Sequence, residues 1–371
     1  MFTFGLMSLL AVLAIWIGYP VVVRVLATLR RERVIPQGEM PSVSVILASH
    51  DEAHAIEARV RDLFAGNHPR DKLEVIVALD AARARATPAT LAHLGPDVTV
   101  IIGDAPGGKA SSLNAAVRAA HHELLVFADT AQRFDANAIP ALVAGLRDPA
   151  FGAVSGSLDL GDSTKTVNLA ERYWAYEKWL RYWEARLQSC VGVTGAIYAM
   201  RRALWEPLPA GTILDDVYTP MRLVQQGWRV GFTDQARAHD ARRFEAGDEY
   251  RRKVRTLTGV IQLCVWLPGI MNPLRNPIWL QFVFHKLLRL LTPWLTICVA
   301  FAVAWVSVAA LLASPVGAKV LPVGVIGGGL LLLVPGIRRV VRARLAWGIA
   351  LQSSVVVATI NGVRGRWDVW Q

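Results

Sequence analysis

The chain has 371 residues, of which 53% are hydrophobic, with a mean hydropathy of +0.35 and a formal net charge of +11. This composition excludes an ordinary soluble protein, although the middle of the chain is long enough to bury a core of its own. A strongly basic chain can bind nucleic acid, an anionic membrane surface or a phosphate-bearing substrate. No nucleic-acid-binding module is visible, so we expect membrane lipids and phosphates, and no nucleic acid, as partners.

The three cysteines, Cys190, Cys264 and Cys298, are far apart in the sequence. None has the spacing of metal ligands, and two lie in or near apolar segments. We interpret them as buried thiols, which suits a reducing cytoplasm.

The first segment, residues 2–29, is almost entirely apolar and is long enough to cross a hydrocarbon core of about 30 Å. A signal peptide is the alternative, but no basic residues precede the run and the run is too long for one. Three arginines follow directly, and by the positive-inside rule they place the next part of the chain in the cytoplasm. These are Arg30, Arg31 and Arg33.

From Pro41 onward, short apolar runs alternate with stretches of helical spacing. The runs predict strands at residues 43–48, 73–79, 98–102 and 124–127. Such alternation predicts an α/β fold with a mostly parallel sheet covered on both faces. Ligands of such sheets bind at the carboxyl ends of the strands, so the residues there are candidates for a phosphate or metal site. They are Ser49, His50, Glu52, Asp80, Asp104 and Asp129.

Residues 171–188 form a predicted helix rich in aromatic side chains. Tyr176, Trp179 and Trp183 fall on one face of it. They either pack against the core or the membrane interface, or form a stacking platform for sugar rings. Trp183 is therefore a candidate substrate-binding residue.

After a basic amphipathic stretch at residues 248–263, three prolines interrupt the chain between Trp266 and Trp279. Helix breaks beside tryptophans are typical of a segment that lies at the membrane interface. Further apolar runs predict membrane-spanning helices at residues 287–312 and 320–334, with a shorter run at 345–360. Arginines from Arg338 to Arg344 mark the cytoplasmic side again.

These segments predict four parts. They are an N-terminal transmembrane helix (1–29), a cytoplasmic α/β domain (30–263), an interfacial helical segment (264–286) and C-terminal transmembrane helices (287–371). We accordingly expect a multi-pass protein of the inner (plasma) membrane.

Five short motifs follow one another along the α/β domain. They are Pro-Ser-Val-Ser-Val-Ile-Leu-Ala-Ser-His-Asp-Glu at 41–52, Gly-Lys-Ala-Ser-Ser-Leu-Asn at 108–114, Phe-Ala-Asp-Thr at 127–130, Leu-Asp-Asp at 214–216, and Arg222 with Gly-Trp-Arg-Val at 227–230. In this order and with these gaps they resemble the family 2 glycosyltransferases of the GT-A fold. The membrane flanks resemble those of cellulose, hyaluronan and poly-N-acetylglucosamine synthases.

The resemblance implies a role for each matching residue. Asp80 would contact the base or ribose of the nucleotide, and Asp129 would bind Mg²⁺ or Mn²⁺ on the diphosphate. Asp216 would be the general base, with Asp215 orienting it or the acceptor. Lys109 would lie near the phosphates. Structural alternatives stay open, since Asp80 can be a turn residue and Lys109 a surface charge, while an acidic pair can serve as a helix cap.

The chain also departs from the family pattern. The D-x-D motif reads Asp129-Thr-Ala131, so the second carboxylate is missing. One Asp with diphosphate and water could still hold the ion, and His239 or the adjacent Asp240 could add a ligand. Arg252 and Arg255 fall where the synthases carry Q-x-x-R-W over the nucleotide. They either add cations beside the diphosphate or face lipid phosphates.

These features predict an inverting glycosyltransferase that moves a sugar from a nucleotide-diphosphate sugar, with UDP as the expected nucleotide. The acceptor would be a growing polysaccharide or a lipid-linked saccharide at the cytoplasmic face of the membrane. The alternative is a catalytically inactive relative that acts as a scaffold in a polysaccharide assembly or export complex. A transporter without enzymatic activity is disfavoured by the few spans. A second copy or an export partner could complete a path for the product.

Overall fold

The computed structural model describes residues 1–31, 38–160, 169–240, 242, 246–316 and 333–368. The chain divides into two compact units, which are described separately. The α/β unit comprises Val23–Phe244 and Gln262–Phe282. The helical unit comprises Met1–Val22, Glu245–Ile261 and Val283–Trp370.

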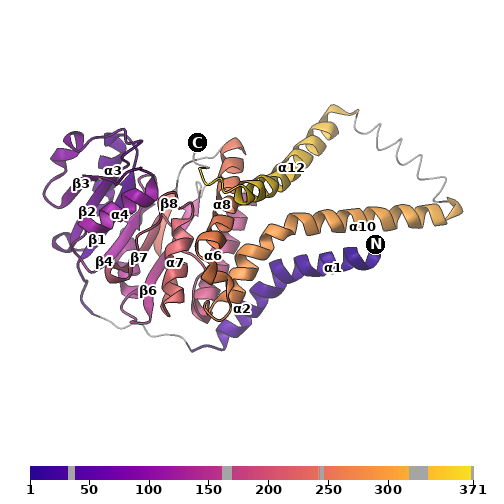
Figure 1. Ribbon diagram of the computed structural model, residues 1–371, viewed down its shortest axis with the longest axis horizontal. Coiled ribbons are helices and arrows are strands. Elements are labelled where there is room, and N and C mark those ends of the chain that lie inside the picture. The colour runs from indigo at the N-terminus through magenta and orange to yellow at the C-terminus, as the bar shows by residue number, and fades with distance from the viewer. Residues whose placement is uncertain (32–37, 161–168, 241, 243–245, 317–332, 369–371) are drawn as a thin grey trace. The chain divides into compact units, whose positions relative to one another are not determined.

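The α/β unit is built on one sheet with the strand order β3-β2-β1-β4-β7-β6-β8-β5 (Figure 1). Strands β1 to β4 run parallel, β7 is antiparallel to its neighbours β4 and β6, and β6 pairs in parallel with β8. The four predicted strands and the mostly parallel α/β sheet are confirmed. The strands are β1 Val43–Ser49, β2 Leu73–Leu79, β3 Val98–Ile102, β4 Leu124–Ala128, β5 Arg133–Phe134, β6 Phe151–Leu160, β7 Ile197–Arg201 and β8 Arg229–Asp240.

Helix α6 (Leu169–Leu187) differs from the predicted helix at 171–188 by only one or two residues at its ends, where helix boundaries are least distinct. The α-helices are α1 Phe2–Leu13, α2 Tyr19–Thr28, α3 Ala53–Phe64, α4 Lys109–Ala119, α5 Ala138–Gly145, α6 Leu169–Leu187, α7 Asp215–Gln225, α8 Ala246–Trp266, α9 Trp279–Phe282, α10 Thr292–Ala313 and α12 Pro335–Val363. Shorter 3₁₀ and π turns are η1 Ala14–Gly18, η2 Arg70–Lys72, η3 Ala89–Leu94, η4 Arg202–Leu204, η5 Pro268–Met271, η6 Val283–Leu287 and η7 Leu288–Leu291.

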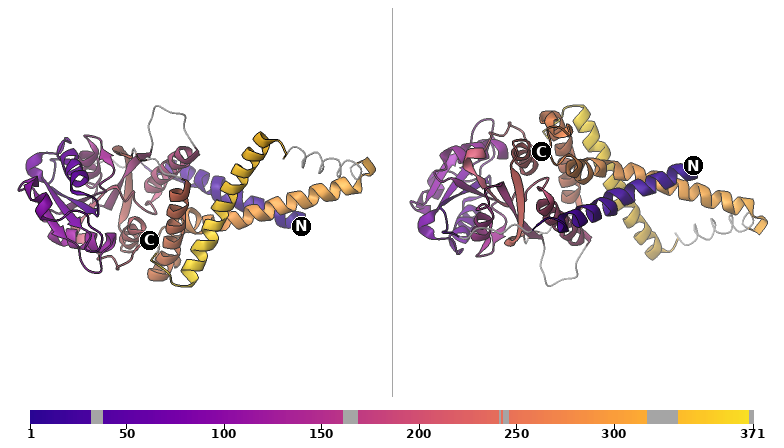
Figure 2. Two further views of the ribbon diagram at one scale, coloured as in Figure 1. Left: turned by 90° about the horizontal axis from the view of Figure 1, so that it is seen from above. Right: turned by 90° about the horizontal axis from the view of Figure 1, so that it is seen from below.

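Helices cover both faces of the sheet, as Figure 2 shows in two further views. The apolar sequence of β1 explains this arrangement, because nearly every residue from Val43 to Ser49 is buried, whichever face it points to. On one face, side chains such as Val45 pack into a core with α3 and α5. On the other face, α4 contacts β1 and β2. The carboxyl ends of β1, β2 and β4 thereby meet at one edge, next to the first turn of α4.

In the helical unit, α1 lies against α10 (Figure 1). Gly5 makes this close approach possible, since a Cβ on it would lie 2.2 Å from the Cβ of Ala302. Small residues at such contacts are typical of paired membrane helices. Most large apolar side chains on these two helices are exposed, among them Phe2, Phe301 and Trp305.

Two described helices are long and apolar enough to cross a membrane, Phe2–Thr28 and Trp279–Ala313, with mean hydropathies of 2.3 and 2.5. The first passes through η1 just before Pro20, which has no N–H for the carbonyl of Trp16. The predicted span at 320–334 falls almost entirely outside the described residues. The predicted run at 345–360 is part of α12, which also holds the arginines. Length and composition are the support for these spans, so the multi-pass arrangement stays a prediction.

Candidate active site

Lys109, the first residue of α4, places its ammonium between carboxylates from two other elements. Its Nζ lies 3.1 Å from Asp129 Oδ1, just after β4, and 3.4 Å from Asp215 Oδ2, in the first turn of α7. Burial alone would lower the pKa of the amine, but attraction from Asp129, Asp215 and Asp216 outweighs burial and raises the pKa well above its usual value. Lys109 therefore stays charged at any working pH, and four predicted site residues lie together.

The two acids that open α7 differ in their surroundings. Asp215 is 11% exposed and is held by Lys109, whereas Asp216 is half-buried. Pro220 in the same helix has no N–H to donate to the carbonyl of Asp216 four residues earlier. That carbonyl instead accepts a hydrogen bond from the N–H of Val193, at 2.8 Å. Because Pro220 cannot donate, the carbonyl of Asp216 can accept from the loop that precedes β7.

This loop carries glycine where it passes the acidic pair. A Cβ on Gly195 would lie 3.2 Å from the Cβ of Asp216 and 3.8 Å from Lys109 Nζ. A Cβ on Gly192 would lie 3.0 Å from the backbone oxygen of Asp216. The two glycines therefore let the loop approach the acid more closely than a residue with a side chain could. None of the sequence motifs includes them, and their signal in the sequence is two glycines three residues apart before an apolar run.

The carboxylate of Asp80 holds the turn that leads into α4. Its Oδ1 accepts from the N–H of Ala82 at 2.9 Å, and its Oδ2 accepts from the N–H of Gly108 at 3.1 Å. Gly107 and Gly108 have φ values of +95° and +88°, which favour glycine. Asp80 is therefore a turn residue in this structure. Each carboxylate oxygen has a second lone pair, and the contact of Asp80 with the nucleotide stays a prediction.

Ser49 links the ends of β1 and β4. Its buried Oγ accepts from the hydroxyl of Thr130 at 2.9 Å and from the N–H of Asp51 at 3.1 Å. The two other candidates from this edge are exposed. His50 follows β1 directly, and Glu52 lies 3.3 Å from His54.

Two arginines that sequence analysis did not single out belong to this site. Arg59 on α3 is fully buried and donates its Nε to the backbone carbonyl of Asp129 at 3.1 Å. Burial lowers the pKa of Arg59 to about 10, although Asp62 opposes the shift. Arg59 lies among the apolar residues of the buried face of α3, and a charged residue at such a position is the signal for it in the sequence. Arg242 donates to both oxygens of Asp240, at 2.9 and 2.7 Å.

The Asp129 carboxylate also attracts the charge of Arg242. The hydrogen bond to Asp240 is the main cause that raises the pKa of Arg242, and Asp129 adds to the increase. Asp240 accepts a further hydrogen bond from Gln132 Nε2 at 2.8 Å. This carboxylate is thus engaged by two side chains.

The predicted metal ligands fit a divalent ion only in part. Asp129 is 34% exposed and shares its Oδ1 with the Lys109 ammonium, and position 131 is Ala. His239 lies 2.7 Å from Asp135 through Nε2. Within the described ranges, no three His, Cys, Asp or Glu side chains lie close enough to hold a metal ion. An ion on Asp129 would therefore need diphosphate oxygens and water as its other ligands, which Mg²⁺ accepts.

The remaining predicted residues lie elsewhere. Trp183 packs edge-on against Trp179, with Arg24 and Arg186 at 5.6 and 5.9 Å from its ring. These contacts agree with the packing interpretation of the aromatic face. Arg252 and Arg255 lie on the part of α8 that belongs to the helical unit, so their contact with the nucleotide stays a prediction.

Comparison with known proteins places this geometry in a family. Residues 41–259 match the family model described as glycosyltransferase like family 2. The probable glycosyltransferase YdaM of Bacillus subtilis (strain 168) is 25% identical over 220 residues, 54% of this chain and 52% of that protein, so the chain spans about half the length of this relative. A mannosyltransferase from Pyrobaculum calidifontis, PcManGT, solved with GDP-Man and Mn²⁺, shares the fold with a TM-score of 0.67. It is 23% identical, and the match covers 98% of this chain and 99% of that one.

Proposed function

The chain belongs to the family 2 glycosyltransferases and has their GT-A fold, and from this premise we propose that it transfers a sugar from a nucleoside diphosphate sugar to an acceptor hydroxyl with inversion. The observation that carries the proposal is the Lys109 ammonium between Asp129 and Asp215, next to Asp216 and the close approach of Gly195. This arrangement offers a cation for a leaving diphosphate and a carboxylate for an acceptor proton within one small space.

In the proposed reaction, Asp216 accepts the proton of the acceptor hydroxyl as its oxygen attacks the anomeric carbon. The bond from that carbon to the diphosphate breaks, and the bonding electrons leave with the diphosphate. Lys109 stabilises the charge that develops there. Asp215, which is less exposed and bound to Lys109, holds the ammonium in place. Attack and departure on opposite faces in a single displacement invert the configuration.

A divalent ion would be held by Asp129 together with diphosphate oxygens. It would supply additional positive charge at the leaving group. The Mn²⁺ in the structure of the P. calidifontis mannosyltransferase supports use of such an ion. Loss of the second carboxylate, at Ala131, means that Lys109 and Arg242 carry more of this neutralisation than in a chain with two metal-binding acids.

We further propose UDP as the nucleotide and a growing polysaccharide or lipid-linked saccharide as the acceptor, at the cytoplasmic face of a membrane. The four-part domain organisation predicted above belongs to the same proposal. The exposed apolar surface of α1 and α10 supports the membrane, because soluble proteins rarely expose such surface. The GDP-Man of the mannosyltransferase makes GDP the nucleotide against which UDP has to be tested.

The test is release of nucleoside diphosphate from a panel of UDP-linked and GDP-linked sugars by the full chain in detergent, with Mg²⁺, with Mn²⁺ and with EDTA. We expect turnover of one donor and loss of turnover in Asp216→Asn, with nucleotide binding retained. Turnover that survives this substitution would refute the assigned base. Nucleotide binding without turnover of any donor, in the presence of membrane lipids and saccharide acceptors, would favour the scaffold that the missing carboxylate also suggests.

A further inference from the structure

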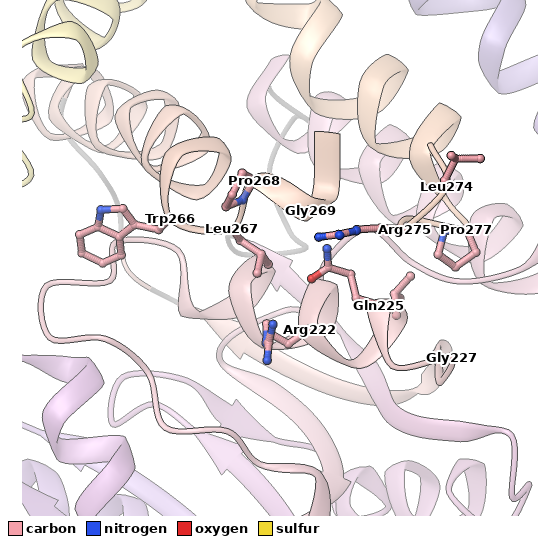
Figure 3. A pocket seen from close by; sticks show the side chains of 11 residues that line it. Arg222, Gln225, Gly227, Trp266, Leu267, Pro268, Gly269, Leu274, Arg275 and Pro277 are labelled. Carbon is pink, nitrogen blue, oxygen red and sulfur yellow. The ribbon is translucent and has the colours of Figure 1, made fainter. Parts of the chain in front are cut away.

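A pocket of about 730 Å³ lies at the end of α7 that is remote from the acidic pair (Figure 3). One wall is the last turn of α7, and the other is the segment that follows α8. An eleven-residue helix is about 16 Å long, so this pocket is separate from the site described above. The residues that the argument uses are Arg222, Gln225, Trp266, Gly269, Leu274 and Arg275.

The segment that forms the second wall is fixed by two asparagines. Asn272 Oδ1 accepts from the N–H of Leu274 at 2.9 Å. The buried Asn276 donates its Nδ2 to the carbonyl of Ile270 at 2.8 Å, and its Oδ1 accepts from the N–H of Ile278 at 3.1 Å. These hydrogen bonds brace the segment, which presents Leu274 and Arg275 at its surface.

Two arginines line the pocket, and only one of them is paired with a carboxylate in the described part of the chain. Arg222 forms an ion pair with Glu206. Arg275 is exposed and forms no side-chain hydrogen bond or ion pair with any described residue, and Figure 3 shows its guanidinium extending over the pocket toward Gln225. A guanidinium with an amide beside it matches the oxygens of a phosphate.

The segment that carries this cation exposes several apolar side chains. Leu274 is 93% exposed, Leu280 61%, Val265 58% and Met271 43%. All four lie between residues 265 and 280, in one segment of the α/β unit, and Leu274 lines the pocket together with Trp266 and Arg275. Exposed large apolar side chains concentrated in this way mark an interaction surface. A ligand that matches both parts must carry phosphate and hydrocarbon together.

We infer that this pocket binds the phosphate headgroup of an anionic membrane phospholipid, with Arg275 on the phosphate and Leu274 among the acyl chains. Basic pockets on the cytoplasmic side of membrane proteins bind such headgroups. The inference does not depend on the proposed sugar transfer, because it rests on different residues and needs no turnover. It adds a specific lipid site to the general affinity for the interface that the prolines and tryptophans predict.

The test uses the full chain in detergent with phosphatidylglycerol added, and counts bound lipid by native mass spectrometry. We compare the wild type with Arg275→Gln, which removes the cation, and with Leu274→Ser, which removes the apolar contact. Arg61→Gln is the matched control, since Arg61 is an exposed arginine on α3 of the same unit. Phosphatidylcholine and inorganic phosphate serve as competitors that separate the lipid from free phosphate.

We expect Arg275→Gln to weaken phosphatidylglycerol binding at least about fivefold, as for loss of one cation at an anionic leaflet, while Arg61→Gln binds as the wild type does. Leu274→Ser should weaken binding of both lipids alike. Equal losses in Arg275→Gln and Arg61→Gln would show diffuse attraction and overturn the site. Displacement of the lipid by inorganic phosphate at an equal concentration would also overturn it, because the apolar rim would then contribute nothing.

Discussion

Replacement of Lys109 by Gln removes the charge that holds the proposed active site together while keeping a side chain of similar length. The two ion pairs, at 3.1 and 3.4 Å, each correspond to about 5 kcal/mol at an effective dielectric constant of about 20 and to about 1 kcal/mol in bulk water. Because the side chains are between 11% and 34% exposed, the attraction lies between these limits. The uncharged amide would also leave Asp129 and Asp215 to repel each other.

We expect Lys109→Gln to lower kcat/KM by about 10²–10³-fold, the usual cost of removing one preorganised donor at a developing charge. The free energy of unfolding should fall by about 1 kcal/mol, as for other partly exposed ion pairs. Millimolar Mn²⁺ should restore more activity to the variant than it adds to the wild type, since both carboxylates are then available to the ion. Nucleoside diphosphate release and thermal unfolding measure the two effects separately.

The matched control is Lys178→Gln. Lys178 pairs with Asp159 in the same unit, and the two side chains are 26% and 34% exposed, nearly the same as Lys109 and Asp129. Both substitutions should cost similar stability, and the loss of activity should be confined to Lys109→Gln. Equal turnover in the two variants would refute the role of the ammonium in leaving-group departure.

Three further outcomes follow from local geometry. Gly195→Val should lower kcat at least about tenfold, because a Cβ there would lie only 3.2 Å from the Cβ of Asp216 and the larger side chain would displace the base. Gly107→Ala should destabilise the fold by about 1–3 kcal/mol in urea unfolding, since φ is +95° and the Cβ would lie 2.7 Å from a carboxylate oxygen. Burial alone would raise the pKa of Asp240, but hydrogen bonds from Arg242 outweigh it and lower the pKa below its ordinary 3.8. The ionised carboxylate therefore stabilises the fold fully above about pH 4. This stabilisation is lost as the pH falls through the lower pKa of the folded state. Asp240→Asn should thus cost about 2 kcal/mol at pH 7 and progressively less below about pH 4.

The sequence predicts the parallel half of the sheet because its strands are buried on both faces and read as continuous apolar runs. The position of Asp129 at a strand end makes it a candidate, and the resemblance to family 2 glycosyltransferases adds the acidic pair Asp215 and Asp216. The strands β6, β7 and β8 are not predicted, and β8 shows why. Its residues alternate between buried and exposed over its second half and include many polar side chains, so that it carries no apolar run.

Contacts between distant segments account for what else the sequence does not show. Lys109 and Asp215 are more than a hundred residues apart, and their ion pair requires both the α4 turn and the start of α7 to be in place. Arg59 binds a backbone carbonyl, which every residue has and no motif can signal. The roles assigned to Arg252 and Arg255 stay predictions for a related reason, since their part of α8 lies in the other unit.

The missing N–H of Pro220 has a consequence for how the base is held. In an uninterrupted helix, the carbonyl of Asp216 would belong to the helix, and the acidic turn would follow wherever the helix axis moved. Here that carbonyl is bonded to Val193, so the turn is shared between two segments. An alanine at position 220 would restore a donor that competes with the loop for one oxygen. Two donors would then compete for the backbone carbonyl of Asp216, and the outcome would decide how the base is aligned. Pro220, which takes no part in the reaction, settles this competition in favour of the loop.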